Sequence, residues 1–152
     1  HSIAEHPDWD LSHALEQSNQ YETFLRAISA LRRVVRPGSL VIIISDFLGF
    51  REMCYAMLAK LSQHNELLTV SVSDPIEMSP PPPGNYRLVC GDQERSIETY
   101  STQARNEYSE KFNQRQEELS SFFRRYGIHN ISISTDQDPI EAIINSLGKR
   151  VN

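Results

Sequence analysis

The stretch Leu40-Val41-Ile42-Ile43-Ile44-Ser45-Asp46, residues 40–46, decides the fold class. Its aliphatic residues run continuously instead of alternating with polar ones, which is typical of a central parallel strand buried on both faces. The run is far shorter than the roughly 20 apolar residues that a membrane helix needs. It predicts a strand over residues 39–45 that is buried on both faces.

Helical patterns flank this strand. Before it, apolar residues recur at spacings of three and four over residues 22–35, which predicts a helix with one buried face. After it, a helix is expected over residues 51–64 and a second strand over residues 67–73. Strand, helix and strand in this order form a βαβ unit with a right-handed crossover.

The second half of the chain adds a hairpin, two helices and a third strand. In chain order we expect a polyproline spacer (79–84), hairpin strands (86–90 and 95–99), a long helix (102–126), a strand (128–134) and a helix that begins after Asp138. The core stripe expected on the long helix consists of Ala104, Tyr108, Phe112, Leu119, Phe122 and Tyr126. The whole pattern predicts a three-layer α/β fold on a mostly parallel sheet, with an added β-hairpin and a long helix.

The chain has the length of one domain, 152 residues. We expect a polar, irregular segment over residues 1–20, the folded portion over 21–148 and a short tail over 149–152. The net charge of −5 comes from 20 acidic and 15 basic residues, with no long block of like charge, so nucleic acid and membrane insertion are not expected. Cys54 and Cys90 form no CxxC pair, which favours two buried thiols in a reducing, cytoplasmic compartment.

Each predicted parallel strand ends in hydroxyl residues and an acid. The candidates are Ser45 and Asp46 after the first strand, Asp74 after the second, and Thr135 and Asp136 after the third. Ligands of open parallel sheets bind at this carboxyl edge, and carboxylate and hydroxyl oxygens suit Mg²⁺. An Asp in this position also commonly caps a helix or begins a turn, a reading that applies to Asp74 and Asp136 above all.

Several motifs in one order resemble the bacterial family called domain of unknown function 58. These motifs lie at residues 31–41, 44–47, 74–75, 84–87, 124–128 and 134–139. The resemblance covers about residues 22–148, and it corresponds to the C-terminal half of that family. It therefore implies that this chain is a fragment of a larger α/β domain.

Members of this family resemble von Willebrand factor type A domains, which bind partners through a metal-ion-dependent adhesion site. The resemblance implies that Asp46, with Ser45 beside it, is a remnant of that site, while the DxSxS motif that supplies the main ligands is absent. It implies Mg²⁺ in the full-length parent and no cofactor in this fragment. The partner that the resemblance implies is a MoxR-type AAA+ ATPase.

The von Willebrand arrangement places the first strand beside the fourth, so a fragment that lacks the first half exposes residues 40–44 at a sheet edge. A long apolar edge pairs readily with another strand. We expect the strand over residues 39–45 either to pair with its copy in a homodimer or to lie beneath residues 1–20.

Two functions from different classes remain open. The first is a protein-binding module that is not an enzyme, which is favoured by the absence of GxGxxG, GxxxxGK[ST], GxSxG and HExxH motifs. The second is a metal-dependent, phosphatase-like hydrolase that uses Asp46 as nucleophile or metal ligand. A purely structural role is the third alternative.

Overall fold

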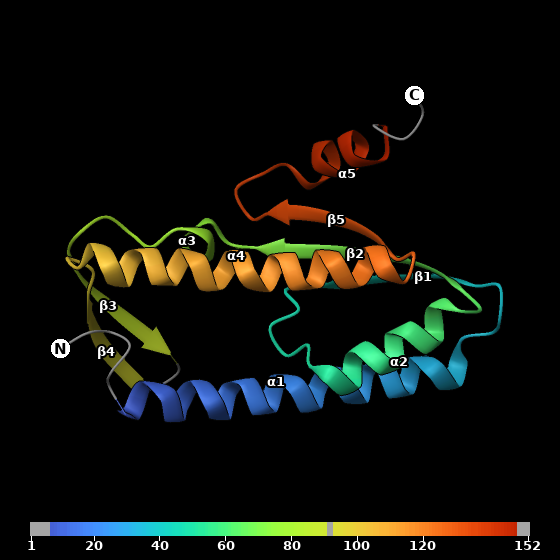
Figure 1. The fold of residues 1–152 in the computed structure, drawn as a ribbon, viewed down its shortest axis with the longest axis horizontal. Coiled ribbons are helices and arrows are strands. Elements are labelled where there is room, and N and C mark those ends of the chain that lie inside the picture. The colour runs from blue at the N-terminus through green and yellow to red at the C-terminus, as the bar shows by residue number, and fades with distance from the viewer. Residues whose placement is uncertain (1–6, 91–92, 149–152) are drawn as a thin grey trace.

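A computed structural model describes residues 7–90 and 93–148 of the chain (Figure 1). The helices and strands are α1 (Pro7–Val34), β1 (Leu40–Ser45), α2 (Glu52–Ser62), β2 (Glu66–Ser73), α3 (Pro75–Met78), β3 (Asn85–Cys90), β4 (Gln93–Glu98), α4 (Thr102–Arg125), β5 (His129–Ser134) and α5 (Pro139–Gly148). This order confirms the predicted α/β organisation, with α3 as the one added element.

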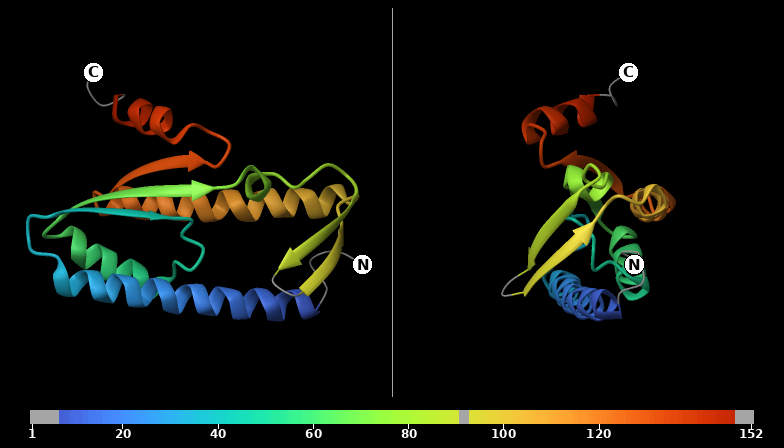
Figure 2. Two further views of the ribbon diagram at one scale, coloured as in Figure 1. Left: turned by 180° about the vertical axis from the view of Figure 1, so that it is seen from behind. Right: turned by 90° about the vertical axis from the view of Figure 1, so that its left-hand side faces the viewer.

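The main sheet has the strand order β1-β2-β5, and both pairings are parallel. Leu40 lies opposite Glu66, and Leu68 lies opposite His129. Strands β3 and β4 pair only with each other, as an antiparallel hairpin. All three strands of the main sheet therefore end at the same edge, as Figure 2 shows from behind.

Helices cover the two faces of the sheet unequally. Helices α1, α2 and α4 enclose the larger core on one face, which contains Ile28, Val41, Phe47, Phe50, Cys54, Leu58, Leu61, Leu67, Leu119, Phe123 and Ile128. On the other face α5 places Ala142 and Ile143 against Ile131 and Ile133 of β5. The end-on view in Figure 2 shows the resulting layers, with α5 on the opposite side of the sheet from α1 and α2.

Helix α1 begins at Pro7, so the prediction of an irregular segment before a helix at residue 22 is wrong for residues 7–20. Proline suits the first helical position because its fixed φ matches the helix and its missing N–H is not needed there. No further proline or glycine interrupts the sequence up to Val34, and the helix continues across the expected boundary at residue 20. Residues 1–6 and 149–152 lie outside the described residues.

Strand β1 is buried on one face only, so the prediction of burial on both faces is also wrong. Val41 points into the large core and is 5% exposed, whereas Leu40, Ile42 and Ile44 on the other face are 60%, 55% and 69% exposed. On that face α5 shares a cluster with residues of β5 and β2, and nothing in the described part of the chain covers β1 there. The alternative that residues 1–20 cover the strand finds no support among residues 7–20, which form the first half of α1 and begin near the hairpin in Figure 1.

Two smaller expectations meet different outcomes. On α4 the buried side chains are Leu119 and Phe123, while Tyr108 and Tyr126 of the predicted stripe are more than a third exposed. Cys54 is a buried free thiol, as expected, and the side chain of Cys90 lies outside the described residues. No helix within the described ranges is both long and apolar enough to cross a bilayer.

Candidate functional site

The carboxyl ends of β1, β2 and β5 form one rim, as the parallel pairing requires. Ser73 lies opposite Ser134, while Ser45 lies opposite Ser71, so β1 ends two residues earlier than its neighbour. Across the β2–β5 pair, the hydroxyl of Thr135 donates to Oδ2 of Asp74 at 2.8 Å. The sequence-based gathering of hydroxyls and acids at this edge is confirmed for these strands.

Asp46 is held exposed at the rim by a tight turn. Its Oδ1 accepts hydrogen bonds from the amide of Leu48 at 3.1 Å and from the hydroxyl of Ser45 at 3.4 Å. The Ser45 hydroxyl oxygen in turn accepts from the amide of Phe47 at 3.0 Å. Both residues predicted as remnants of an adhesion site therefore shape the backbone that follows β1.

Phe47 adopts a left-handed conformation with φ 55°, which is costly for a bulky residue. Packing compensates, because the ring is 1% exposed and lies 5.8, 5.5 and 5.4 Å from the rings of Phe24, Phe50 and Phe123. Strained backbone of this kind is concentrated at functional sites. The aromatic cluster thus fixes the turn that presents Asp46.

Gly49 brings the same turn against helix α1. A Cβ added at this position would lie 2.6 Å from the carbonyl carbon of Gln20 and 2.7 Å from the amide nitrogen of Tyr21. Only glycine allows the two backbones to approach this closely. The position of the Asp46 turn therefore depends on its contact with α1.

Asp74 caps the short helix α3. Its Oδ1 accepts from the amide of Ile76 at 3.0 Å, and this bond, together with the hydroxyl of Thr135, lowers the pKa of the Asp74 carboxyl. The capping alternative is thus correct for Asp74. Asp136 is exposed in the turn after β5, and no hydrogen bond or ion pair within the described residues joins it to the rest of the rim.

Sequence reasoning missed three residues that the fold adds to this rim. Glu77 of α3 and Arg115 of α4 form an ion pair, with Oε2 and Nη2 3.6 Å apart, and Tyr108 of α4 donates from its hydroxyl to the carbonyl of Ile76 at 3.0 Å. Burial raises the pKa of Glu77, Arg115 opposes this effect, and the charges of Asp46 and Asp74 raise the pKa further. Three carboxylates and one guanidinium therefore influence one another here.

One sequence signal could have located Glu77. Asp-Pro-Ile-Glu occurs twice, at residues 74–77 and 138–141, and only the second copy was interpreted as a helix start. The structure shows both copies capping helices, because Asp138 also accepts from the amides of Ile140 and Glu141, at 2.8 and 3.2 Å. No comparable signal marks Arg115 and Tyr108, which come from a distant helix.

The rim is an open surface. Two hollows of about 510 and 310 Å³ lie along α4, and neither is lined by a residue of the rim. Within the described ranges no three His, Cys, Asp or Glu side chains are arranged to hold a metal ion. Buried polar atoms without a hydrogen-bond partner include Glu77 Oε2, Arg115 Nε and Ser134 Oγ, which leaves bonding capacity unused beside the rim.

Comparison with known proteins identifies the family. The sequence model of "Protein of unknown function DUF58" matches residues 11–118. The uncharacterized protein MAV169 of Mycobacterium avium is 29% identical over 127 residues, which cover 82% of this chain and 73% of the relative. No solved structure matches. Because the family model matches more than half of the sequence, the chain belongs to the DUF58 family of proteins of unknown function.

Proposed function

We propose that this chain is part of a protein-interaction module without catalytic chemistry of its own, and that the rim at the carboxyl ends of β1, β2 and β5 contacts the partner. The observation that supports this proposal is that Asp46 is exposed on a turn fixed by Phe47 and Gly49. Such a turn presents one carboxylate in a defined position. A rigid, exposed group of this kind suits recognition of another surface.

The chemistry of the rim indicates what the partner brings. Asp46 and Asp74 are acidic, and the pKa of Asp74 is lowered, so its carboxylate is charged at neutral pH. Exposed carboxylates attract arginine and lysine side chains of a partner and form charge-assisted hydrogen bonds with them. As the family resemblance implies, the partner that we propose is a MoxR-type AAA+ ATPase, which would supply the nucleotide chemistry and present a basic surface.

A Mg²⁺ ion is not required for this contact. The side chains of Ser45 and Asp46 provide three oxygen atoms, and the hydroxyl of Ser45 is already engaged with the amide of Phe47. An ion at this position in the parent protein would therefore take further ligands from outside the described residues. Binding measured with Mg²⁺ and with EDTA separates the two modes.

The test compares variants at the two ends of the sheet. Isothermal titration of the wild-type chain with the purified ATPase gives the reference affinity. We expect Asp46→Ala to weaken binding about tenfold, which corresponds to roughly 1.4 kcal/mol. The matched control is Glu66→Ala, which removes an exposed carboxylate at the opposite end of the sheet and should leave the affinity unchanged. Full affinity of Asp46→Ala would show that the rim is not the contact.

The hydrolase remains the alternative because the fold supplies a feature that such chemistry needs. Asp46 and Asp74 both act on Glu77 electrostatically, and Arg115 lies beside it, so a second acid and a cation are present. The discriminating assay is hydrolysis of p-nitrophenyl phosphate with Mg²⁺. The interaction module predicts no turnover above buffer, whereas turnover that disappears in Asp46→Asn would favour the hydrolase.

A further inference from the structure

Strand β1 has one unpaired edge. It ends the sheet order β1-β2-β5, and its six residues include no proline and no charged side chain of the kind that protects natural edges. The carbonyl of Ser39 accepts from the amide of Glu66 at 3.0 Å, so the backbone of Ser39 faces β2. Because alternate residues face the same side, the N–H and C=O groups of Leu40, Ile42 and Ile44 face the free edge.

The same three residues carry the exposed apolar side chains of β1. Leu40, Ile42 and Ile44 are 60%, 55% and 69% exposed, and they lie together on the face that α5 leaves open. The unpaired backbone groups and the exposed apolar side chains of β1 thus belong to the same three residues. A second strand that pairs with this edge and places apolar residues opposite these three would bond their free N–H and C=O groups. It would also add apolar side-chain contacts.

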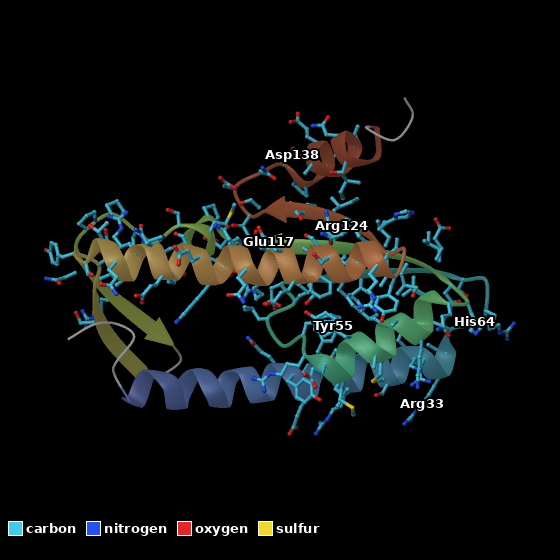
Figure 3. All side chains as sticks on the ribbon, viewed as in Figure 1. Arg33, Tyr55, His64, Glu117, Arg124 and Asp138 are labelled. Carbon is cyan, nitrogen blue, oxygen red and sulfur yellow. The ribbon has the colours of Figure 1, made fainter. Side chains whose placement is uncertain are left out.

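Charge is distributed unevenly along the strand direction. Helices α1 and α4 both end where the strands begin, and their last turns carry the exposed residues Arg32, Arg33, Arg124 and Arg125. Figure 3 shows Arg33, His64 and Arg124 toward this end. The opposite end carries Asp46, Asp74 and Glu77. Exceptions include Glu66 at the basic end and Arg51 and Arg115 at the acidic end.

We propose that β1 pairs antiparallel with β1 of a second copy of this chain, across a two-fold axis that passes midway between the two copies of Ile42. This inference goes beyond the proposed function and does not depend on it. An antiparallel arrangement places the basic end of each copy beside the acidic end of the other. A second copy therefore supplies hydrogen-bond partners for the edge, apolar side chains for the exposed face and opposite charges at both ends. An unrelated strand need not supply all three, which favours a second copy as the occupant.

The alternation of the strand allows only registers that differ by two residues, and centring on Ile42 is the one that pairs all three outward-facing residues of each copy. With Ile42 opposite Ile42 of the partner subunit, Leu40 lies opposite Ile44 of the partner subunit, and each such pair can exchange two hydrogen bonds. A shift by one residue would oppose outward-facing backbone groups with inward-facing ones and would mix the two faces of the sheet.

Sedimentation equilibrium of the 152-residue chain over a wide concentration range tests the proposal. We expect a reversible dimer, and we expect the amides of Leu40, Ile42 and Ile44 to exchange hydrogen more slowly as the chain concentration rises. Ile42→Lys places two like charges opposite each other at the axis and should weaken the dimer by roughly a hundredfold. Higher salt should weaken the wild-type dimer a few-fold, because the end-to-end charge contacts are screened.

Two further variants keep the experiment decisive. Ile42→Pro removes only an N–H that faces the free edge, so it should retain the fold and weaken the dimer. Ile140→Lys changes an equally exposed apolar residue on α5, two strands away, and should leave the dimer intact. The proposal is overturned by a monomer at all concentrations, by open-ended larger assemblies, or by equal weakening in Ile42→Lys and Ile140→Lys.

Discussion

Replacing Gly49 with alanine tests how the turn that presents Asp46 is positioned. Gly49 follows the left-handed residue Phe47, and its backbone lies directly against that of Gln20 and Tyr21 in helix α1. An added Cβ meets only backbone atoms there, and backbone atoms have no rotamer with which to move aside. The turn and the helix must therefore separate.

The magnitude follows from the distances. The new Cβ would lie 2.6 Å from the nearest backbone atom, and ordinary contact begins at 3.4 Å, so the two segments must move apart by about 0.8 Å. Overpacking of this kind costs about 1–3 kcal/mol. Alanine also raises the free energy of unfolding by about 0.4–1 kcal/mol, because it restricts the unfolded chain more than glycine does. We expect Gly49→Ala to lower the free energy of unfolding by about 1–2 kcal/mol.

Urea unfolding followed by circular dichroism measures this free energy. Gly148→Ala is the matched control, because a Cβ at Gly148 meets nothing within 4 Å, and its stability should stay within about 0.5 kcal/mol of the wild type. If Gly49→Ala is as stable as Gly148→Ala, the close contact does not hold the turn. Contact with α1 would then not be what positions Asp46.

Three further changes probe the rim and the sheet. Asn130→Ala removes the acceptor of two hydroxyl bonds from β2, at 2.9 and 2.8 Å, and should cost about 1–2 kcal/mol in urea unfolding. Burial raises the folded-state pKa of Glu77 above 4.5, so ionisation of Glu77 should reduce stability as pH rises above that value. Glu77→Gln should therefore gain stability relative to the wild type when unfolding is measured from pH 4 to 7. A stability difference that does not change with pH would contradict this. Thr135→Val removes a donor to Asp74, so the pKa of Asp74, followed by carboxyl NMR titration, should rise toward 3.8. An unchanged titration would show that the hydroxyl does not act on this carboxyl.

Local sequence patterns predicted most of the elements correctly. The continuous run over residues 40–44 identified a strand of a parallel sheet, and the Asp138-Pro139 start identified α5, because periodicity and caps depend on neighbours in the chain. The same reasoning failed at residues 7–20, where a polar composition was interpreted as irregular although nothing after Pro7 breaks a helix. Polar residues leave helix formation open, because intrinsic propensity alone is a weak guide.

Only part of the candidate site could be predicted from the sequence. Ser45, Asp46, Asp74 and Thr135 could be placed at one rim because parallel strands end at the same edge. Arg115 could not, because it sits on α4 at a position fixed only when that helix packs beside α3 and forms the ion pair with Glu77.

The sequence by itself determined that this chain forms parallel strands joined by helices and that acids follow their carboxyl ends. Only the tertiary structure decided which face of β1 is covered. An uninterrupted aliphatic run has the same pattern whether one or two helices pack on it, since burial depends on what lies above each face. Here α1, α2 and α4 cover one face, while the cluster under α5 on the other face includes β5 and β2 but not β1, so Leu40, Ile42 and Ile44 stay exposed beside an unpaired edge.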